Sequence, residues 1–159
     1  MKRNDKKSDC AINFSLETFG DPWSLLIVRD IIYFGKRTYG EFLASDERIG
    51  TSVLARRLAA LEKKGILTKT LNKTDKRKEE YRLTSKGLDL IPLLLDLAEW
   101  GGTHDPDTGA SRQWIIAIQA DREGIIKRTK NIVGGGGSVL GDYGSIVKGK
   151  NFQLKTKGL

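Results

Sequence analysis

Residues 49–65 carry the most regular pattern of apolar and polar positions in the chain. Four apolar side chains recur there at helical spacing and form one stripe: Val53, Leu54, Leu58 and Leu61. Thr51 or Ser52 can serve as the N-cap, because a short hydroxyl accepts from the free amides of the first turn. Gly65 can end the helix, since glycine adopts the left-handed position after a helix end without strain. The pattern predicts an amphipathic helix.

The polar face of this predicted helix has two interpretations. Small side chains and two arginines gather at its leading end: Thr51, Ser52, Ala55, Arg56 and Arg57. Such a helix fits the major groove of DNA, where arginine pairs with guanine. The alternative is an ordinary surface helix with solvated arginines. Because successive helical residues point about 100° apart, the sequence does not decide which arginine would read a base.

Two helices are predicted at the start of the chain. Residues 1–9 are polar and charged, and we expect a mobile arm there. The apolar period from Cys10 to Phe19 suits a short helix that ends at Gly20. Asp21 and Pro22 then suit the N-cap and the first position of a second helix, which ends at Gly35.

A third, shorter helix is predicted over residues 38–43. Thr38 is a suitable N-cap, and Glu41 lies at capping-box distance from it. Residues 46–48 form a turn into the amphipathic helix described above. A short helix, a tight connection and a helix with a polar leading end follow one another, which is the order of a helix-turn-helix.

Beyond Gly65 the apolar period becomes that of strands. Residues 66–71 and 79–83 are rich in β-branched, aromatic and alternating positions. The connection over residues 72–78 holds four cations and one anion. A hairpin with a basic tip directly after a helix-turn-helix is a wing. Taken alone, the loop could equally be a solvated connection that protects edge strands.

The rest of the chain is predicted to be helical with one interruption. Thr84 and Ser85 suit the N-cap of a helix that runs to Trp100, with Pro92 as a potential kink inside it. Residues 101–109 are predicted as a linker or turn, where His104 is a solvated residue. A final helix over about residues 111–132 has more apolar surface than one small domain can cover, so we expect a partner subunit to cover it.

Composition narrows the function class. A chain of 159 residues has room for one domain with a real core. The net charge of +8 favours a polyanionic partner. One cysteine excludes an intramolecular disulfide and a multi-cysteine zinc site, so no metal is expected. No signal pattern or membrane-length apolar run occurs, which predicts a cytoplasmic protein without a membrane partner.

The C-terminal residues 134–159 are glycine- and lysine-rich. They begin Gly-Gly-Gly-Gly-Ser, which is the repeat unit of flexible engineered linkers. No helical period is evident after Val139. We expect a flexible tail outside the fold, either an engineered joint with an appended peptide or a native extension.

Several segments together resemble one known family. Cys10 precedes a glycine-containing step into a helix led by Trp23, and residues 36–42 resemble an Arg-aromatic-x-Glu-Leu segment. Residues 54–65 resemble a Leu-x-x-Arg-Leu-x-x-Leu-Glu-x-x-Gly recognition helix, and residues 80–87 resemble a Glu-Tyr-x-Leu-Thr-x-x-Gly wing end. Over about residues 10–133 the chain thus resembles the HxlR-type winged helix-turn-helix transcription regulators.

The resemblance implies an α+β, mainly α fold with a winged helix-turn-helix over residues 10–133. Added dimerisation helices would occupy about residues 10–19 and 111–132. It implies a homodimer that places each recognition helix in a major groove of double-stranded DNA, with the wings on flanking minor groove or phosphates. Two-fold symmetry predicts a near-palindromic site with half-site centres about 34 Å apart, or a multiple of that.

The predicted DNA contacts come from three segments. They are Lys36 and Arg37 before the third helix, Thr51, Ser52, Arg56 and Arg57 on the recognition helix, and Lys73, Lys76, Arg77 and Lys78 in the wing. An arginine on a guanine is the most informative of these contacts, whereas the lysines act mainly on phosphate.

Two further features concern regulation. In HxlR-type regulators the N-terminal cysteine can be a thiol sensor, and Cys10 stands at the matching position. The alternative for Cys10 is an inert buried cysteine packed beside Phe14. Five aromatic residues could line a pocket for a small-molecule effector or could be plain core: Trp23, Tyr33, Phe34, Tyr39 and Trp100.

We therefore expect a homodimeric, sequence-specific transcription regulator with no cofactor. A helical protein–protein dimerisation module with nonspecific basic affinity for DNA is the alternative. No nucleophile–base pair, phosphate-binding glycine loop or carboxylate cluster stands out, so an enzyme is not expected.

Overall fold

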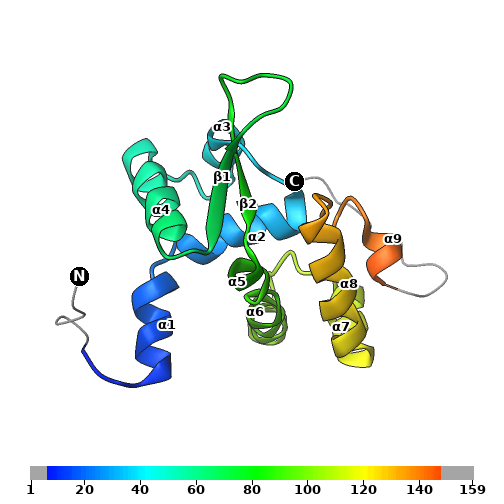
Figure 1. The fold of residues 1–159 in the computed structure, drawn as a ribbon. Coiled ribbons are helices and arrows are strands. Elements are labelled where there is room, and N and C mark those ends of the chain that lie inside the picture. Colours follow the sequence, from blue (N-terminus) through cyan, green and yellow to red (C-terminus); the bar gives the residue numbers. More distant parts are fainter. Residues whose placement is uncertain (1–6, 148–159) are drawn as a thin grey trace.

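The computed structural model describes residues 7–147, which form helices around a small antiparallel sheet (Figure 1). In chain order the elements are α1 (Ala11–Phe19), α2 (Ser24–Phe34), α3 (Tyr39–Leu43), α4 (Thr51–Lys63), β1 (Leu67–Leu71), β2 (Glu79–Leu83), α5 (Ser85–Leu88), α6 (Ile91–His104), α7 (Arg112–Ala120), α8 (Arg122–Gly134) and α9 (Tyr143–Ile146). The predicted class, mainly α with a winged helix-turn-helix, is confirmed.

Helix α2 lies at the centre of the core. Val28 and Ile31 of α2 are fully buried, and they belong to the same apolar cluster as Leu54 and Leu58 of α4. The helix also contacts α6, α8 and β2. Burial of these apolar side chains is the main driving force for folding, so α2 fixes where the helix-turn-helix and the sheet lie.

The helix-turn-helix forms as predicted, with one correction at the start of α4. Thr38 and Glu41 make the full capping box at α3. The N-cap of α4 is Gly50, not Thr51 or Ser52, and no side chain caps this end. Gly65 has φ 72°, and its amide and that of Ile66 bond back to Glu62 and Leu61. This is the Schellman geometry that ends helices at glycine.

The wing is a short hairpin whose strand β2 has one backbone hydrogen bond to the segment before α3. β1 and β2 pair from Leu67 opposite Leu83 to Leu71 opposite Glu79. The Tyr81 amide in β2 donates to the carbonyl oxygen of Arg37 at 2.7 Å. The segment before α3 therefore adds one backbone hydrogen bond to the free edge of β2.

The predicted helix over residues 84–100 is two helices. α5 ends at Leu88 and α6 begins at Ile91, so that Pro92 occupies the first turn of α6, where its missing amide costs no hydrogen bond. The glycines 101 and 102, predicted as a linker, lie inside α6, and His104 is its last residue. These glycines were mistaken for a break because tertiary packing overrides their low helix propensity.

The predicted final helix is also two helices, and much of its apolar surface is covered within the chain, although Ile116 remains exposed. Asp121 separates α7 from α8, and its carboxylate accepts from the Gly124 amide as an N-cap of α8. Trp114, Ile118 and Ile125 are buried among α2, α6 and the segment that follows α8. The expectation that a partner subunit covers this surface is therefore wrong for these residues.

The tail predicted from residue 134 is part of the fold as far as Val147. Gly136 has φ 96°, and the amides of Gly136 and Gly137 bond back to Val133 and Ile132 in a second Schellman arrangement. Val139, Tyr143, Ile146 and Val147 are then buried. The four glycines end α8 and turn the chain back onto the domain. Residues 1–6 of the predicted arm and 148–159 of the predicted tail lie outside the described residues.

Candidate nucleic-acid interface

Helix α4 presents a polar face to solvent beside the wing. Leu54, Leu58 and Leu61 face the core, which leaves Thr51, Ser52, Ala55, Arg56 and Ala59 exposed along the opposite side. β1 packs against α4, and the loop from β1 to β2 extends away from the body (Figure 1). The Tyr39 hydroxyl of α3 donates to the Thr51 carbonyl at 3.0 Å and holds the two helices together at the start of α4.

The structure separates the two arginines of α4. Arg56 is exposed and forms no ion pair with any carboxylate in residues 7–147. The Nε of Arg57 lies 3.2 Å from Oδ1 of Asp21, at the start of α2. Partial burial acts to raise the pKa of Asp21, but hydrogen bonds from Ser24 and Trp23 and the charge of Arg57 lower it. Arg57 therefore binds the body of the protein, and Arg56 is available to a ligand.

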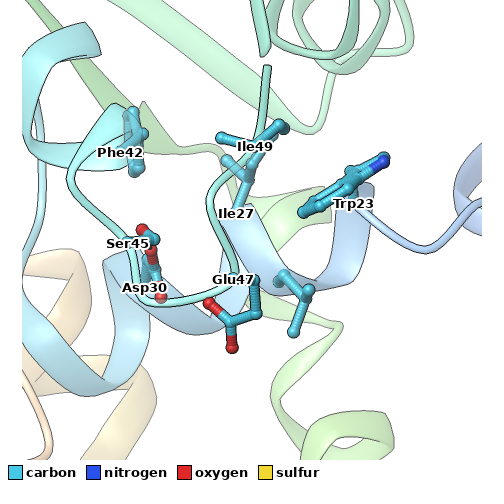
Figure 2. A pocket seen from close by; sticks show the side chains of 8 residues that line it. Trp23, Ile27, Asp30, Phe42, Ser45, Glu47 and Ile49 are labelled. Atoms are coloured by element: carbon cyan, nitrogen blue, oxygen red, sulfur yellow. Dashed lines mark hydrogen bonds between the residues drawn. The ribbon is translucent and has the colours of Figure 1, made fainter. Parts of the chain in front are cut away.

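A charged cluster holds the turn between α3 and α4 to α2. The carboxylate of Asp30, almost fully buried, accepts from Lys36 Nζ at 3.0 Å, from the Arg29 guanidinium and from the Ser45 hydroxyl. Figure 2 shows Asp30 and Ser45 facing one another across the turn. Arg29 also binds Glu47 through both carboxylate oxygens. The position of α4 thus depends on charged side chains that pair with one another within the protein.

The pKa of Glu47 is lowered by its pairing with Arg29. The hydrogen bond from Arg29 is the main cause that lowers this pKa to about 2, against a smaller opposing effect of burial. The carboxylate is therefore ionised at every pH at which the protein is expected to act. The link from Arg29 to the turn persists across that range.

Lys36 and Arg37, predicted to contact DNA, are directed into the protein. Lys36 Nζ is bound to Asp30 and Ser45. The guanidinium of Arg37 donates to three backbone carbonyls, those of Ile31, Lys36 and Gly137. Burial is the main cause that lowers the pKa of Arg37, and the nearby charge of Arg82 adds to it. Neither side chain presents an open charge to a phosphate.

The wing loop carries exposed cations on a turn that is held by hydrogen bonds. Asn72 accepts from the amides of Thr74 and Asp75 and fixes the loop. Arg77 is 91% exposed but pairs with Asp75 at 3.1 Å. The other three predicted contacts are exposed and form no ion pair with a described carboxylate: Lys73, Lys76 and Lys78.

Sequence reasoning missed one cation at this surface. Arg48 is exposed in the turn directly before α4, and it is the non-glycine residue with a positive φ, 55°, among residues 7–147. It precedes Gly50, the N-cap of α4, by two residues. The signal for it in the sequence is its position in the turn between the two helices.

Cys10 lies far from this surface, at the N-cap of α1. Its thiol is exposed. The alternative of an inert buried cysteine packed beside Phe14 is therefore wrong. An exposed thiol at the start of a helix is open to reagents from solvent.

The five aromatic residues do not line a common pocket. Tyr33 accepts from the indole of Trp114, Tyr39 bonds to α4, and Phe34 and Trp100 are exposed on α2 and α6. Of the five, Trp23 alone borders the hollow of Figure 2, which has room for roughly one water molecule. Separate elements hold these side chains, so within residues 7–147 they do not line one pocket.

Two kinds of site are absent from the described part of the chain. Residues 7–147 contain no cluster of histidine, cysteine, aspartate and glutamate side chains that could hold a metal ion. Among the same residues, no helix combines the length and the apolar character needed to cross a bilayer.

Comparisons with known proteins agree with this geometry. A sequence model described as HxlR-like helix-turn-helix matches residues 18–108. The HTH-type transcriptional regulator Rv3095 of Mycobacterium tuberculosis is 34% identical over 96 residues, which cover 60% of this chain and 60% of that protein. YybR of Bacillus subtilis, named in the same way, is 32% identical over 62% of this chain and 78% of its own length. This chain thus spans less than two thirds of the mycobacterial relative.

Solved structures give the same result. The transcription-factor candidate PA1607 superposes with a TM-score of 0.60 at 36% identity, over 67% of this chain and 75% of that one. The redox regulator HypR in its oxidized form gives 0.54 at 30% identity, over 60% of this chain and 97% of its own. These relatives are named as regulators, which agrees with the expectation that the protein is not an enzyme. The chain belongs to the HxlR-like helix-turn-helix family.

Proposed function

We propose that this protein is a sequence-specific transcription regulator that binds double-stranded DNA as a homodimer. The observation that carries the proposal is the outward face of α4, where Arg56 is exposed and pairs with no carboxylate of residues 7–147. α4 enters the major groove, and Arg56 reads a base edge there. A DNA partner places the protein in the cytoplasm.

The wing and the turn before α4 bind the backbone of the same DNA. Lys73, Lys76 and Lys78 are exposed and form no ion pair with a described carboxylate, and Arg48 is exposed in the turn before α4. Lysine on phosphate adds affinity that depends on salt but carries little sequence information. Base reading by α4 and phosphate binding by the wing are therefore separable.

The homodimer is supported by apolar side chains that the described chain leaves uncovered. Ile12 and Leu16 on α1 and Leu97 and Trp100 on α6 are exposed, with Trp100 at 68%. Exposed aromatic and aliphatic groups are typical of subunit interfaces. A second copy that covers them gives a two-fold symmetric protein and a near-palindromic DNA site, with half-site centres about 34 Å apart or a multiple.

The proposal is tested by selection from a random DNA duplex pool, with and without a thiol reductant. A retained two-fold symmetric site supports the regulator. Weak, salt-sensitive retention of every sequence supports instead the alternative, a dimerisation module with nonspecific affinity. The comparison with and without reductant tests whether the redox state of Cys10 changes DNA binding. The thiol of Cys10 is exposed, and the chain is similar to the redox regulator HypR. If the parent and Cys10→Ser retain the same site equally under both conditions, Cys10 is not a sensor.

Arg56→Ala is expected to cost about 1–3 kcal/mol of binding free energy and to relax sequence preference. The reason is loss of a base contact from the exposed side chain of α4. Affinities for the selected site and for single-base variants measure both effects. Arg57→Ala is the matched control and should keep the preference, because Arg57 faces Asp21. Uniform weakening by Arg56→Ala would make Arg56 a phosphate contact.

Lys76→Ala should weaken binding to all sequences alike and lower the slope of affinity against salt concentration by about one.

Trp100→Asp is expected to weaken dimerisation about 30-fold or more, because buried aromatic side chains dominate interface energies. Sedimentation equilibrium of the variant and the parent measures the change. Leu71→Asp is the control, since Leu71 is an exposed apolar residue on β1, at a distance in sequence and fold from α6. Equal dimerisation of Trp100→Asp and the parent would exclude α6 from the interface.

A further inference from the structure

The segment after α8 supplies hydrogen bonds that the end of α2 lacks. The last carbonyls of any helix have no partner within the helix. In α2, the carbonyl of Ile32 accepts from the Val139 amide at 2.8 Å and that of Tyr33 from the Leu140 amide at 3.0 Å. Ile31 accepts from Arg37 Nη1 at 3.2 Å. The end of α2 is thus capped by residues more than 100 positions later and by Arg37.

Arg37 also joins this segment to the wing. Its Nη2 donates to the Gly137 carbonyl at 3.2 Å, and its own carbonyl accepts from the Tyr81 amide of β2 at 2.7 Å. Its amide donates to Glu41 of α3. One residue therefore contacts the C-terminal segment, the wing and the helix-turn-helix.

The glycines of the segment allow this close approach. A Cβ at Gly136 would lie 3.3 Å from a guanidinium nitrogen of Arg82 at the base of the wing, where Gly136 also has φ 96°. A Cβ at Gly137 would lie 2.5 Å from Asp142 and 2.7 Å from Ile132. A side chain at Gly137 must displace the γ-methyl of Ile132 and the Asp142 carboxylate, which accepts from the Ser138 amide at 3.0 Å. We expect the loss of this bond to disturb the loop and the Gly137 carbonyl that Arg37 binds.

We propose that Arg37 is a positioning residue through which residues 135–140 set the position of the wing for DNA binding. Affinity for DNA then depends on a C-terminal segment that does not contact DNA. The proposal rests on the proposed DNA-binding function. The competing role for Arg37 is a direct phosphate contact, in which case the segment has no effect on the wing.

The first test measures the wing without DNA, by hydrogen exchange of the Tyr81 amide. Gly137→Ala displaces the loop, and Arg37→Ala removes the guanidinium. Both are expected to speed exchange at Tyr81. Gly144→Ala is the matched control, because a Cβ there meets no atom within 4 Å, and it should exchange like the parent. Unchanged exchange in Gly137→Ala, in a chain that remains folded by circular dichroism, would overturn the proposal.

The second test uses DNA and separates the two roles of Arg37. Gly137→Ala and Arg37→Ala should each weaken binding to the selected site about fivefold, and the double variant should bind no worse than either alone. The salt slope should stay unchanged. Arg37→Lys should behave like Arg37→Ala, because an ammonium group lacks the planar fork that reaches three carbonyls. Rescue by lysine, additive losses or a salt slope lowered by about one would each make Arg37 a phosphate contact.

Failure of the proposed function is distinguishable from failure of this inference. If the parent selects no DNA site, the function fails, and the Tyr81 exchange alone decides whether the segment and the wing are coupled. If the parent selects a site and the Gly137→Ala variant binds it as the parent does, the function stands and the positioning role is overturned.

Discussion

Ile146→Ala is expected to lower the free energy of unfolding by about 2–5 kcal/mol, as other large-to-small substitutions in a core do. Ile146 is fully buried in α9. The carbonyl of the same residue accepts from Arg128 Nε at 2.6 Å, which holds α9 against α8. Removing three carbon atoms leaves a cavity that these fixed neighbours cannot fill. Urea denaturation of the variant and the parent measures the loss.

The control for this experiment lies in the same short helix. Ser145→Ala changes an exposed side chain beside Ile146 and should alter stability by less than about 0.5 kcal/mol. If residues 134–147 were a flexible tail, both substitutions would leave the unfolding curve unchanged. Equal curves for Ile146→Ala and the parent would therefore contradict the fold described for the end of the chain.

The error about this segment has a physical cause. A run of four glycines serves a flexible linker and a tight helix end equally well, because both need free backbone dihedrals. What distinguishes the two is whether the chain then packs back onto the domain. Here it does, and the Val139 amide donates to the Ile32 carbonyl. Four buried side chains follow with no regular period: Val139, Tyr143, Ile146 and Val147. A partner more than 100 residues away leaves no local signal.

Local signals, in contrast, predicted the helix-turn-helix and the wing correctly. The capping box of Thr38, the apolar stripe of α4 and the glycine after it each involve neighbours within about one turn. The strands were recognised for the same reason, since alternation and a polar loop are local features. The breaks before Pro92 and at Asp121 were missed because a proline or aspartate inside an apolar run fits either a kink or an end.

The candidate site was predicted in outline, and the structure refines which cations it contains. The sequence showed Lys36, Arg37, Arg56 and Arg57 as equal positive charges. Three of them are bound by distant partners, whereas Arg56 is not bound by any described carboxylate. Whether a cation faces solvent depends on where the carboxylates and carbonyls of other elements lie. The number of basic residues in a sequence therefore overestimates the number of cations that are available to DNA.

Asp30→Asn is expected to destabilise the protein by about 3 kcal/mol, because removing one partner of a buried ion pair leaves the others uncompensated. The Asp30 carboxylate is 2% exposed and binds Lys36, Arg29 and Ser45. Asparagine keeps the size of the side chain but turns a donor toward groups that are themselves donors. Urea denaturation at neutral pH measures the loss. Asp89→Asn is the control, since the Asp89–Lys130 pair is largely exposed, and it should cost less than about 1 kcal/mol.

Asp30→Asn is also expected to lower the affinity for DNA, which an ordinary core substitution would not do in a protein that stays folded. Asp30 and Ser45 join α2 to the turn before α4, while Glu47 holds the far side of that turn through Arg29. In Asp30→Asn the turn loses its bond to the carboxylate and keeps the Glu47–Arg29 and Lys36–Ser45 contacts, so α4 is less firmly held and can shift against the wing. Affinity for the selected site should then fall even where the variant is fully folded. Equal stability and equal affinity in Asp30→Asn and the parent would mean that Arg29 and Lys36 rehydrate at no cost and that apolar packing alone positions α4.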